Sequence, residues 1–284
     1  MTVVGLGGVE PMPPRILWLA SYPKSGNTWL RALLYNIVHG RLTRSDELQK
    51  RIPDAHKLKS LPLAADSEQA LPIKTHWLPS RIPFAHRTAG FIYVARNPWD
   101  VVASNFDYRL LCGMGALDLV HERARYVDEF IAHRGDPRWR RLGMGGWSEH
   151  VRAWRALAAK VPNLWFRYED LLDDPERELA RLCRFLGLTL DRDAIRAAVA
   201  GASFANMRSL EERELRAGRP GLFAQQGFRK GQQSGRRFVN RGRADWGRDR
   251  LSPDQIARLA ETFAAELELL GYTRPPAPLR AVGT

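Results

Sequence analysis

Residues 16–29 read ILWLASYPKSGNTW, an apolar run that ends in a polar turn and passes directly into a helical pattern. The run Ile16–Ala20 predicts a buried strand, and the spacing of the apolar residues that follow predicts a helix over Thr28–Val38. A strand that stops at such a turn and feeds a helix directs several backbone N–H groups, and the positive end of the helix, toward one point. That geometry binds an anion, usually a phosphate.

The polar residues of this turn suit an anion. Lys24 contributes a full positive charge, the hydroxyls of Ser25 and Thr28 contribute donors, and Gly26 lets the backbone approach a ligand closely. The order differs from the phosphate loop of kinases and NTPases, in which Lys and Ser/Thr follow the second of two glycines. Here Lys24 precedes the only glycine of the turn, and no acidic partner for Mg²⁺ is nearby. On shape alone, an ordinary strand–turn–helix joint is the alternative.

Strand patterns alternate with helical patterns along the rest of the chain. Further apolar runs predict strands at Leu71–Thr75, Phe91–Ala95 and Leu164–Tyr168. Helices are predicted at Pro98–Arg109, Leu117–His133, Trp147–Lys160, Pro175–Leu186 and Pro253–Leu270. This alternation favours the α/β class: a central parallel sheet flanked by helices on both faces, with a P-loop-like turn after the first strand. Ligands bind such a sheet outside the carboxyl ends of its strands.

A single domain is expected over residues 15–272, with a flexible N-terminal tail at 1–14 and a C-terminal tail at 273–284. Residues 41–70 and 213–250 show no clear periodic pattern. Because long irregular segments in a compact domain are commonly functional loops, both are expected to border the active site.

The composition indicates a globular protein with an anionic ligand or partner, since 44% of the 284 residues are hydrophobic and the formal net charge is +13. The two cysteines are too few for a disulfide scaffold, and the seven histidines show no metal-ligand spacing. No apolar stretch is long enough for a transmembrane helix. A reducing compartment, the cytoplasm, is therefore expected.

Two more strand ends carry candidate site residues. The strand Phe91–Ala95 leads into Arg96, and Pro98 begins a helix that places Ser104 in its second turn. Arginine suits bidentate phosphate binding, although an ion pair with Asp100 is the structural alternative. Lys74 and His76 lie two residues apart at another strand end and share one side of the chain there. An imidazole can accept a proton near neutral pH.

Together and in this order, these motifs resemble those of the sulfotransferases that use 3′-phosphoadenosine 5′-phosphosulfate (PAPS). Tyr22–Trp29 resembles the 5′-phosphosulfate loop of that family, and the segment from Phe91 to Ser104 resembles its 3′-phosphate element. Phe228–Gly231 resembles its Arg-Lys-Gly element, although the family often continues with Gly-Asp-Trp and this chain has Ser234–Phe238. The resemblance covers nearly the whole chain and implies PAPS as the sulfuryl donor, with no metal.

The resemblance also implies a role for each residue. His76 would be the general base, Lys24 would stabilise the bridging oxygen, and Lys74 would aid the sulfuryl oxygens. Aromatic faces can stack on adenine, which falls here to Trp29, Tyr168 and Phe204. The remaining donor-binding residues are Ser25, Gly26, Asn27 (Thr in most of the family) and Thr28 in the loop, Arg96 and Ser104 at the 3′-phosphate, and Arg229, Lys230 and Gly231, which close over it.

The expected reaction is in-line transfer to a hydroxyl, or an amine, of a small-molecule acceptor, for which an aromatic or apolar alcohol is a candidate. Two alternatives stay open. A P-loop kinase or NTPase would share the phosphate loop, and a non-enzymatic polyanion-binding module would explain the basic run between Gly227 and Arg243. Nucleic acid is not the expected partner, because no helix-turn-helix, zinc-finger or RNA-binding motif accompanies that run.

Overall fold

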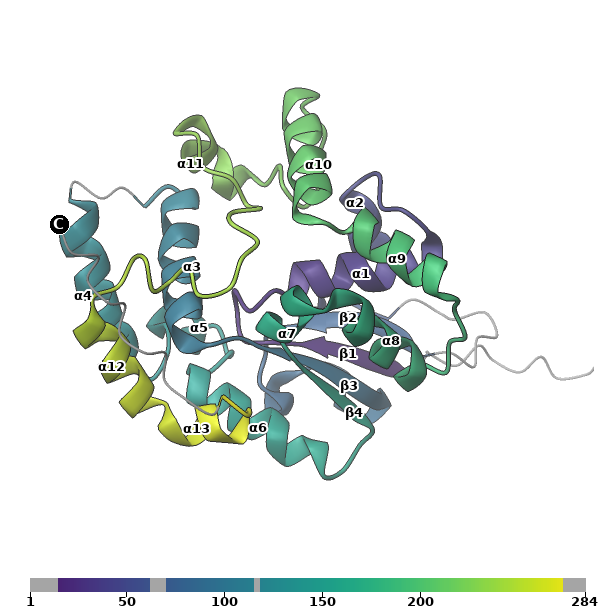
Figure 1. Ribbon diagram of the computed structural model, residues 1–284, viewed down its shortest axis with the longest axis horizontal. Helices are drawn as coiled ribbons and strands as arrows, with labels where there is room; N and C mark the ends of the chain where they lie inside the picture. The colour runs from purple at the N-terminus through teal and green to yellow at the C-terminus, as the bar shows by residue number, and fades with distance from the viewer. Residues whose placement is uncertain (1–14, 62–69, 115–117, 273–284) are drawn as a thin grey trace, which may run out of the picture.

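The sheet carries the strand ends on which the site is built. The computed structural model describes residues 15–61, 70–114 and 118–272, so the predicted tails lie outside the described residues. Its four strands are parallel and lie in the order β2-β1-β3-β4 (Figure 1). They are β1 Ile16–Ala20, β2 Leu71–Thr75, β3 Thr88–Ala95 and β4 Asn163–Arg167. The predicted α/β class with a central parallel sheet is confirmed.

The register of the strands brings their carboxyl ends level. Ala20 of β1 is paired with Thr75 of β2 and Tyr93 of β3, and Ala95 of β3 is paired with Arg167 of β4. The residues that follow the strands therefore emerge at one edge of the sheet, where an α/β fold binds its ligands. These residues are Ser21, His76, Arg96 and Tyr168.

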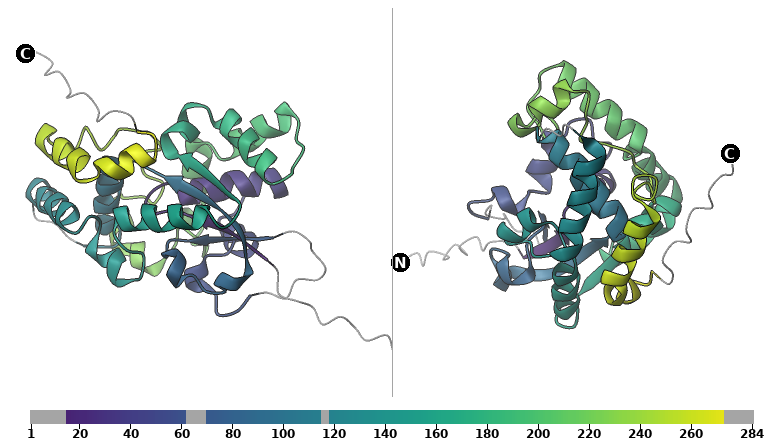
Figure 2. Two further views of the ribbon diagram at one scale, coloured as in Figure 1. Left: turned by 90° about the horizontal axis from the view of Figure 1, so that it is seen from below. Right: turned by 90° about the vertical axis from the view of Figure 1, so that its left-hand side faces the viewer.

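Helices cover both faces of the sheet, as the three views show (Figures 1 and 2). Successive side chains of a strand point to opposite faces, so Trp18 belongs to one hydrophobic core and Leu19 to the other. The core of Trp18 is completed by α3 Pro98–Leu111, α4 Leu119–Ala132, α5 Pro137–Arg141, α6 Trp147–Ala158, α12 Pro253–Thr262 and α13 Ala264–Leu269. The core of Leu19 is completed by α1 Asn27–His39, α2 Asp46–Arg51, α7 Tyr168–Asp173, α8 Pro175–Phe185, α9 Arg192–Gly201 and α10 Phe204–Arg216.

The last predicted helix, Pro253–Leu270, is interrupted at one residue. Ser252 caps its start, because the hydroxyl accepts a hydrogen bond from the N–H of Gln255. Phe263 then leaves the helical conformation (φ −110°, ψ 16°) and separates α12 from α13. Its fully buried ring contacts Phe130 and Trp147 edge-on. The helix is thus interrupted where the Phe263 ring packs into the core, although the apolar residues of the sequence keep helical spacing across this point.

The segments without a clear pattern contain short helices. Residues 41–61 include α2, and residues 213–250 include the end of α10 and the short helix α11, Arg229–Gln233. Helix α10 escapes sequence reasoning because two of its four buried side chains are carboxylates, Glu211 and Glu214. Glu211 accepts hydrogen bonds from the backbone N–H groups of Phe238 and Val239, so α10 anchors the segment after α11. No helix in the described ranges is long and apolar enough to cross a membrane.

Candidate functional site

A cavity of about 450 Å³ opens at the carboxyl edge of the sheet. Its volume lies within the range of small-molecule sites. It is bordered by the loop after β1, the end of β2, the start of α3 and the segment 238–246. Most of the residues singled out from the sequence line it: Lys24, Gly26, Asn27, Thr28, Trp29, Lys74, His76, Arg96, Ser104, Tyr168 and Phe204. The topology thus gathers motifs that are far apart along the chain.

The loop between β1 and α1 has the conformation of an anion cradle. Lys24 and Gly26 both have positive φ, 72° and 99°, which is uncommon for a lysine. A Cβ on Gly26 would lie 2.4 Å from the ring of Tyr168, so only glycine fits there. Among the described residues, no acceptor is recorded for the backbone N–H groups of Gly26, Asn27 and Thr28. These donors stand at the positive end of α1.

The side chains of Asn27 and Ser25 in this loop are buried in the protein. Asn27 donates hydrogen bonds from Nδ2 to the carbonyl oxygen of Leu19 (2.9 Å) and to Oγ of Ser21 (3.2 Å), which ties the helix start to the end of β1. The hydroxyl of Ser25 is buried, has no partner among the described residues and does not line the cavity. Asn27 therefore borders the cavity mainly through its backbone.

Lys24 stands among aromatic rings. Its Nζ lies 4.5 Å from the ring centroid of Tyr108 and 4.9 Å from that of Phe238. Burial, and then the nearby Arg96 guanidinium, lower the pKa of Lys24 to about 8. The ammonium is thus still charged at neutral pH, but it is poorly solvated. An anion bound beside it would offset both the loss of hydration and the repulsion between Lys24 and Arg96.

The ring of His76 is held in one tautomer. Its Nδ1 lies 2.7 Å from the carbonyl oxygen of Ser21, and because a carbonyl can only accept, Nδ1 carries the proton. No described residue is recorded as a hydrogen-bond partner of Nε2, while the residue lines the cavity. Burial, and then the Lys74 ammonium, hold the pKa of His76 well below its usual value. A neutral imidazole with a free Nε2 lone pair is poised to accept a proton.

A second histidine, His150, contacts the backbone of His76, and no sequence motif marks it. His150 of α6 is fully buried, and its Nε2 donates to the carbonyl oxygen of His76 (3.1 Å). The hydroxyl of Tyr93 donates to its Nδ1 (2.8 Å), and burial lowers the pKa of His150 to about 3. His150 is therefore a neutral bridge from the sheet to the backbone of His76.

Lys74 is held by a carboxylate that no sequence motif marks. Its Nζ lies 2.8 Å from Oδ2 of Asp54, and both side chains are largely buried. Burial raises the pKa of Asp54, but the Lys74 ammonium outweighs it, so the carboxylate stays ionised at neutral pH. Asp54 and His56 also line the cavity. Asp54 comes from the irregular segment before β2 and pairs with Lys74 in an isolated β-bridge.

Arg96 forms the ion pair with Asp100, and it also lines the cavity. Its Nη2 lies 3.2 Å from Oδ2 of Asp100, and its guanidinium stacks 4.2 Å from the ring centroid of Tyr168. Nε of Arg96 is buried without a hydrogen-bond partner among the described residues. Asp100 also accepts hydrogen bonds from the N–H groups of Asp245 and Gly247. Asp100 thus holds both the guanidinium of Arg96 and the segment 245–247 in place. Nε of Arg96 still has a hydrogen to donate to a ligand.

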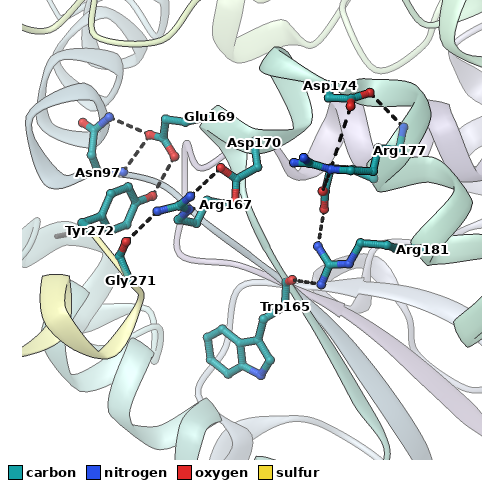
Figure 3. Close-up of polar contacts among 11 residues, drawn as sticks. Asn97, Trp165, Arg167, Glu169, Asp170, Asp174, Arg177, Arg181, Gly271 and Tyr272 are labelled. Atoms are coloured by element: carbon teal, nitrogen blue, oxygen red, sulfur yellow. Dashed lines mark hydrogen bonds and ion pairs between the residues drawn. The ribbon is translucent and has the colours of Figure 1, made fainter.

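Beside Arg96, a polar network ties β3, β4 and the C-terminal segment together, as Figure 3 shows. Glu169 accepts hydrogen bonds from the N–H and Nδ2 of Asn97 and from the hydroxyl of Tyr272. Arg167 binds Asp170 through two nitrogens and donates to the carbonyl oxygen of Gly271. Because Arg96 precedes Asn97 and Tyr168 precedes Glu169, this network sets the backbone of both cavity residues.

The three candidate adenine contacts gather at one end of the cavity. The rings of Trp29 and Tyr168 meet edge-on with centroids 5.6 Å apart, and Trp29 Nε1 donates to the carbonyl oxygen of Ala202 (3.0 Å). Phe204 begins α10 and is 40% exposed. Its ring lies against Gly242, where a Cβ would be 2.3 Å away. An aromatic ligand entering here would find exposed ring surface.

Arg229, Lys230 and Gly231 do not line the cavity. The two basic side chains are exposed on α11, and Gly231 packs against the backbone of Leu111. The residues that reach the cavity from this part of the chain are Phe238, Val239, Asn240, Arg241, Gly242 and Trp246. A sequence signal for this segment exists. Arg241-Gly242 is followed by Asp245-Trp246, and this order resembles the family pattern, Arg-Lys-Gly and then Gly-Asp-Trp, more than Arg229–Gly231 and the residues after it do.

Within the described ranges, no group of three His, Cys, Asp or Glu side chains is placed to hold a metal ion. The sequence pattern that defines the sulfotransferase domain matches residues 14–271. The chain is 28% identical to rat sulfotransferase 1A1 over 205 residues, 69% of this chain and 67% of the relative. It is 27% identical to human sulfotransferase 2B1 over 203 residues, 68% of this chain and 52% of the relative.

Solved structures of low identity share the fold. Mouse sulfotransferase SULT7A1 complexed with PAP (adenosine 3′,5′-bisphosphate) superposes with a TM-score of 0.63 at 20% identity. The superposition covers 89% of this chain and 84% of that one. Retinol dehydratase in a complex with retinol and PAP superposes with a TM-score of 0.66 at 19% identity, covering 94% and 84%.

Proposed function

Because the chain belongs to the sulfotransferase family, we propose that it transfers a sulfuryl group from PAPS to a hydroxyl of a small-molecule acceptor. One observation carries this proposal: a neutral His76, whose Nε2 has no hydrogen-bond partner among the described residues, lines the same cavity as the phosphate loop and Arg96. A base, an anion cradle and a second cationic site are the parts that such a transfer requires.

The residues present fit the donor. The N–H groups of Gly26, Asn27 and Thr28, which have no acceptor among the described residues, would hold the 5′-phosphosulfate together with Lys24. Arg96 and Ser104 would hold the 3′-phosphate. The buried Nε of Arg96 has no partner in the described ranges and offers a donor to it. The half-buried ring of Trp29 and the exposed ring of Phe204 would receive the adenine. PAPS supplies the activated sulfuryl group when it is bound.

The residues around the reacting atoms have separable tasks. His76 Nε2 would accept the hydroxyl proton as the acceptor oxygen forms its bond to sulfur, and the Ser21 carbonyl stabilises the resulting imidazolium through Nδ1. Lys24 would balance the charge that develops on the bridging oxygen as the sulfur–oxygen bond to the leaving group breaks. Lys74, oriented by Asp54, would face the sulfuryl oxygens.

Part of the cavity lining favours an acceptor with an apolar body. Tyr108, Trp139, Met144, Phe228 and Phe238 line this cavity and present aromatic and thioether surface. The two solved complexes of retinol dehydratase with PAP contain retinol and androsterone, which are alcohols on apolar skeletons. We therefore propose an apolar or aromatic alcohol as the acceptor class.

The experiment is a turnover screen. The full chain is incubated with PAPS and with a panel of phenols, aliphatic alcohols, sterols and sugars, and mass spectrometry detects both the sulfated acceptor and adenosine 3′,5′-bisphosphate (PAP). Equimolar appearance of the two products with an apolar alcohol is expected. Release of PAP without any sulfated acceptor across the panel would contradict the proposed acceptor class.

A further inference from the structure

A second hollow, of about 440 Å³, lies among α3, α4, α10 and the segment that follows α11. Figure 1 shows this segment running from α11 past α3 toward α12. Six arginines line the hollow, and Asp107 is the one acidic residue among its described lining residues. We call it the basic hollow, defined by Arg123, Arg208, Arg236, Arg237, Arg241 and Arg250.

Most of these guanidinium groups form no ion pair with a carboxylate of the described residues. Arg208 pairs with Glu212, and Nη1 of Arg250 lies 4.0 Å from Asp107. For the other four, Arg123, Arg236, Arg237 and Arg241, no ion pair with a described residue is recorded. Asp107 itself accepts a hydrogen bond of 2.6 Å from Nδ2 of Asn240. Within the described part of the chain, the carboxylates that interact with these six guanidinium groups are those of Asp107, Glu211 and Glu212. The hollow therefore keeps an excess of positive charge.

Two arginines of the basic hollow are partly shielded from solvent. Nη1 of Arg237 donates only to the carbonyl oxygens of Gln232 and Arg236, and its Nε is buried with no partner among the described residues. Burial, and then the guanidinium of Arg250, lower the pKa of Arg123. Like charges converge here on concave, partly desolvated surface, which is unfavourable unless an anion enters.

We propose that the basic hollow is a second ligand site, which binds a small polyanion carrying two or more phosphate or sulfate groups. A guanidinium presents paired donors that match the oxygens of these groups. The hollow is roomy enough for more than one such group, and its concave walls on three helices suit a compact molecule better than an extended nucleic-acid strand. This site goes beyond sulfuryl transfer and does not depend on it.

The basic hollow is connected to the donor cavity by two shared lining residues, Asn240 and Arg241. A polyanion in the hollow and a 3′-phosphate in the cavity would both draw on the single guanidinium of Arg241. Each ligand is therefore expected to weaken the other, and thermodynamic linkage makes the two effects equal.

Calorimetric titration with tripolyphosphate, in protein saturated with PAP, tests the second site. Binding is expected to persist. The double variant R123A/R236A, whose residues line the basic hollow but not the donor cavity, should bind tripolyphosphate about tenfold more weakly or worse. Its affinity for PAP alone should be unchanged. The matched control is R192A/R219A, which removes the same charge from exposed positions, and it should leave both affinities unchanged.

Three results would overturn the second site. These are loss of all tripolyphosphate binding in PAP-saturated protein, an equal effect of the two double variants, and displacement of tripolyphosphate by a single-stranded oligonucleotide at lower concentration. If PAP fails to bind at all, the proposed sulfuryl transfer fails. The comparison of R123A/R236A with R192A/R219A, made without PAP, then still decides the second site.

Discussion

Nδ1 of His76 lies 2.7 Å from the carbonyl oxygen of Ser21, and these two residues follow neighbouring parallel strands. The contact links the geometry of the sheet to the protonation state of the ring. Since the carbonyl requires the proton on Nδ1, the lone pair resides on Nε2. The strand register thus sets the tautomer of the proposed base before any ligand binds.

Replacing His76 by Ala should remove turnover and spare PAP binding. General-base catalysis is typically worth about 10²–10⁴-fold in rate, so a loss of that size in kcat is expected. Steady-state kinetics and PAP titration on the same preparation measure both quantities. The control is His121→Ala, which changes a histidine whose side chain is 90% exposed on α4. Unchanged kcat in His76→Ala would exclude His76 from proton transfer.

The pH profile of kcat/KM should stay flat on its acid side to well below pH 6.5. The pKa of His76 is lowered, so the ring stays neutral and competent until the pH falls through that lowered value. An acid limb near pH 6.5 or above would show that the ring is solvated and would contradict this environment.

PAP binding should weaken as the pH rises through about 8. Lys24, with a pKa of about 8, is charged below that value and loses its proton above it. Replacing Lys24 by Arg, which stays charged, should move this limb to higher pH in titrations across pH 7–10. If the limb stays in place in Lys24→Arg, another group causes it.

Replacing Asp54 by Asn should uncouple Lys74 from its support. Removing one partner of a largely buried ion pair leaves an uncompensated charge, and a loss of about 3 kcal/mol in the free energy of unfolding is expected. Denaturant unfolding measures this loss, and the double variant D54N/K74M should recover part of it. Equal stability of Asp54→Asn and the wild type would show that the pair is not coupled.

Arg241 and Arg229 should differ in their effect on PAP affinity. Arg241 lines the donor cavity, whereas Arg229 is exposed on α11 outside it. Loss of a charged hydrogen bond to phosphate costs about 1.5–3 kcal/mol, so Arg241→Ala should weaken PAP binding about tenfold or more. Arg229→Ala serves as its matched control and should have little effect. The reverse order would favour the assignment made from the Arg229-Lys230-Gly231 motif.

Much of the fold was predictable because it depends on local pattern. The run Ile16–Ala20 is apolar on both sides, as a strand between two helical layers must be. The site residues Lys24, Gly26 and Arg96 were predictable for the same reason. Arg96 directly follows a buried strand, and Lys24 and Gly26 lie in the short turn between a buried strand and the next helix.

The remaining parts of the site depend on contacts that no local pattern encodes. Asp54 is a single carboxylate in an irregular segment, and only its position beside β2 brings it to Lys74. His150 lies within an ordinary amphipathic helix, and its partner Tyr93 is 57 residues away. The choice between Arg229 and Arg241 depends on the path of the chain after α11, which Glu211 anchors through backbone hydrogen bonds.

The most direct test of the account is calorimetric titration of the full chain with PAP and, separately, with ADP, both without added metal. The 3′-phosphate distinguishes PAP from ADP, and Arg96 lines the cavity where that phosphate would lie. PAP is expected to bind at least about tenfold more tightly than ADP, and Arg96→Ala is expected to remove most of this difference. Equal binding of the two nucleotides by the folded wild-type protein would contradict a PAPS-dependent sulfotransferase.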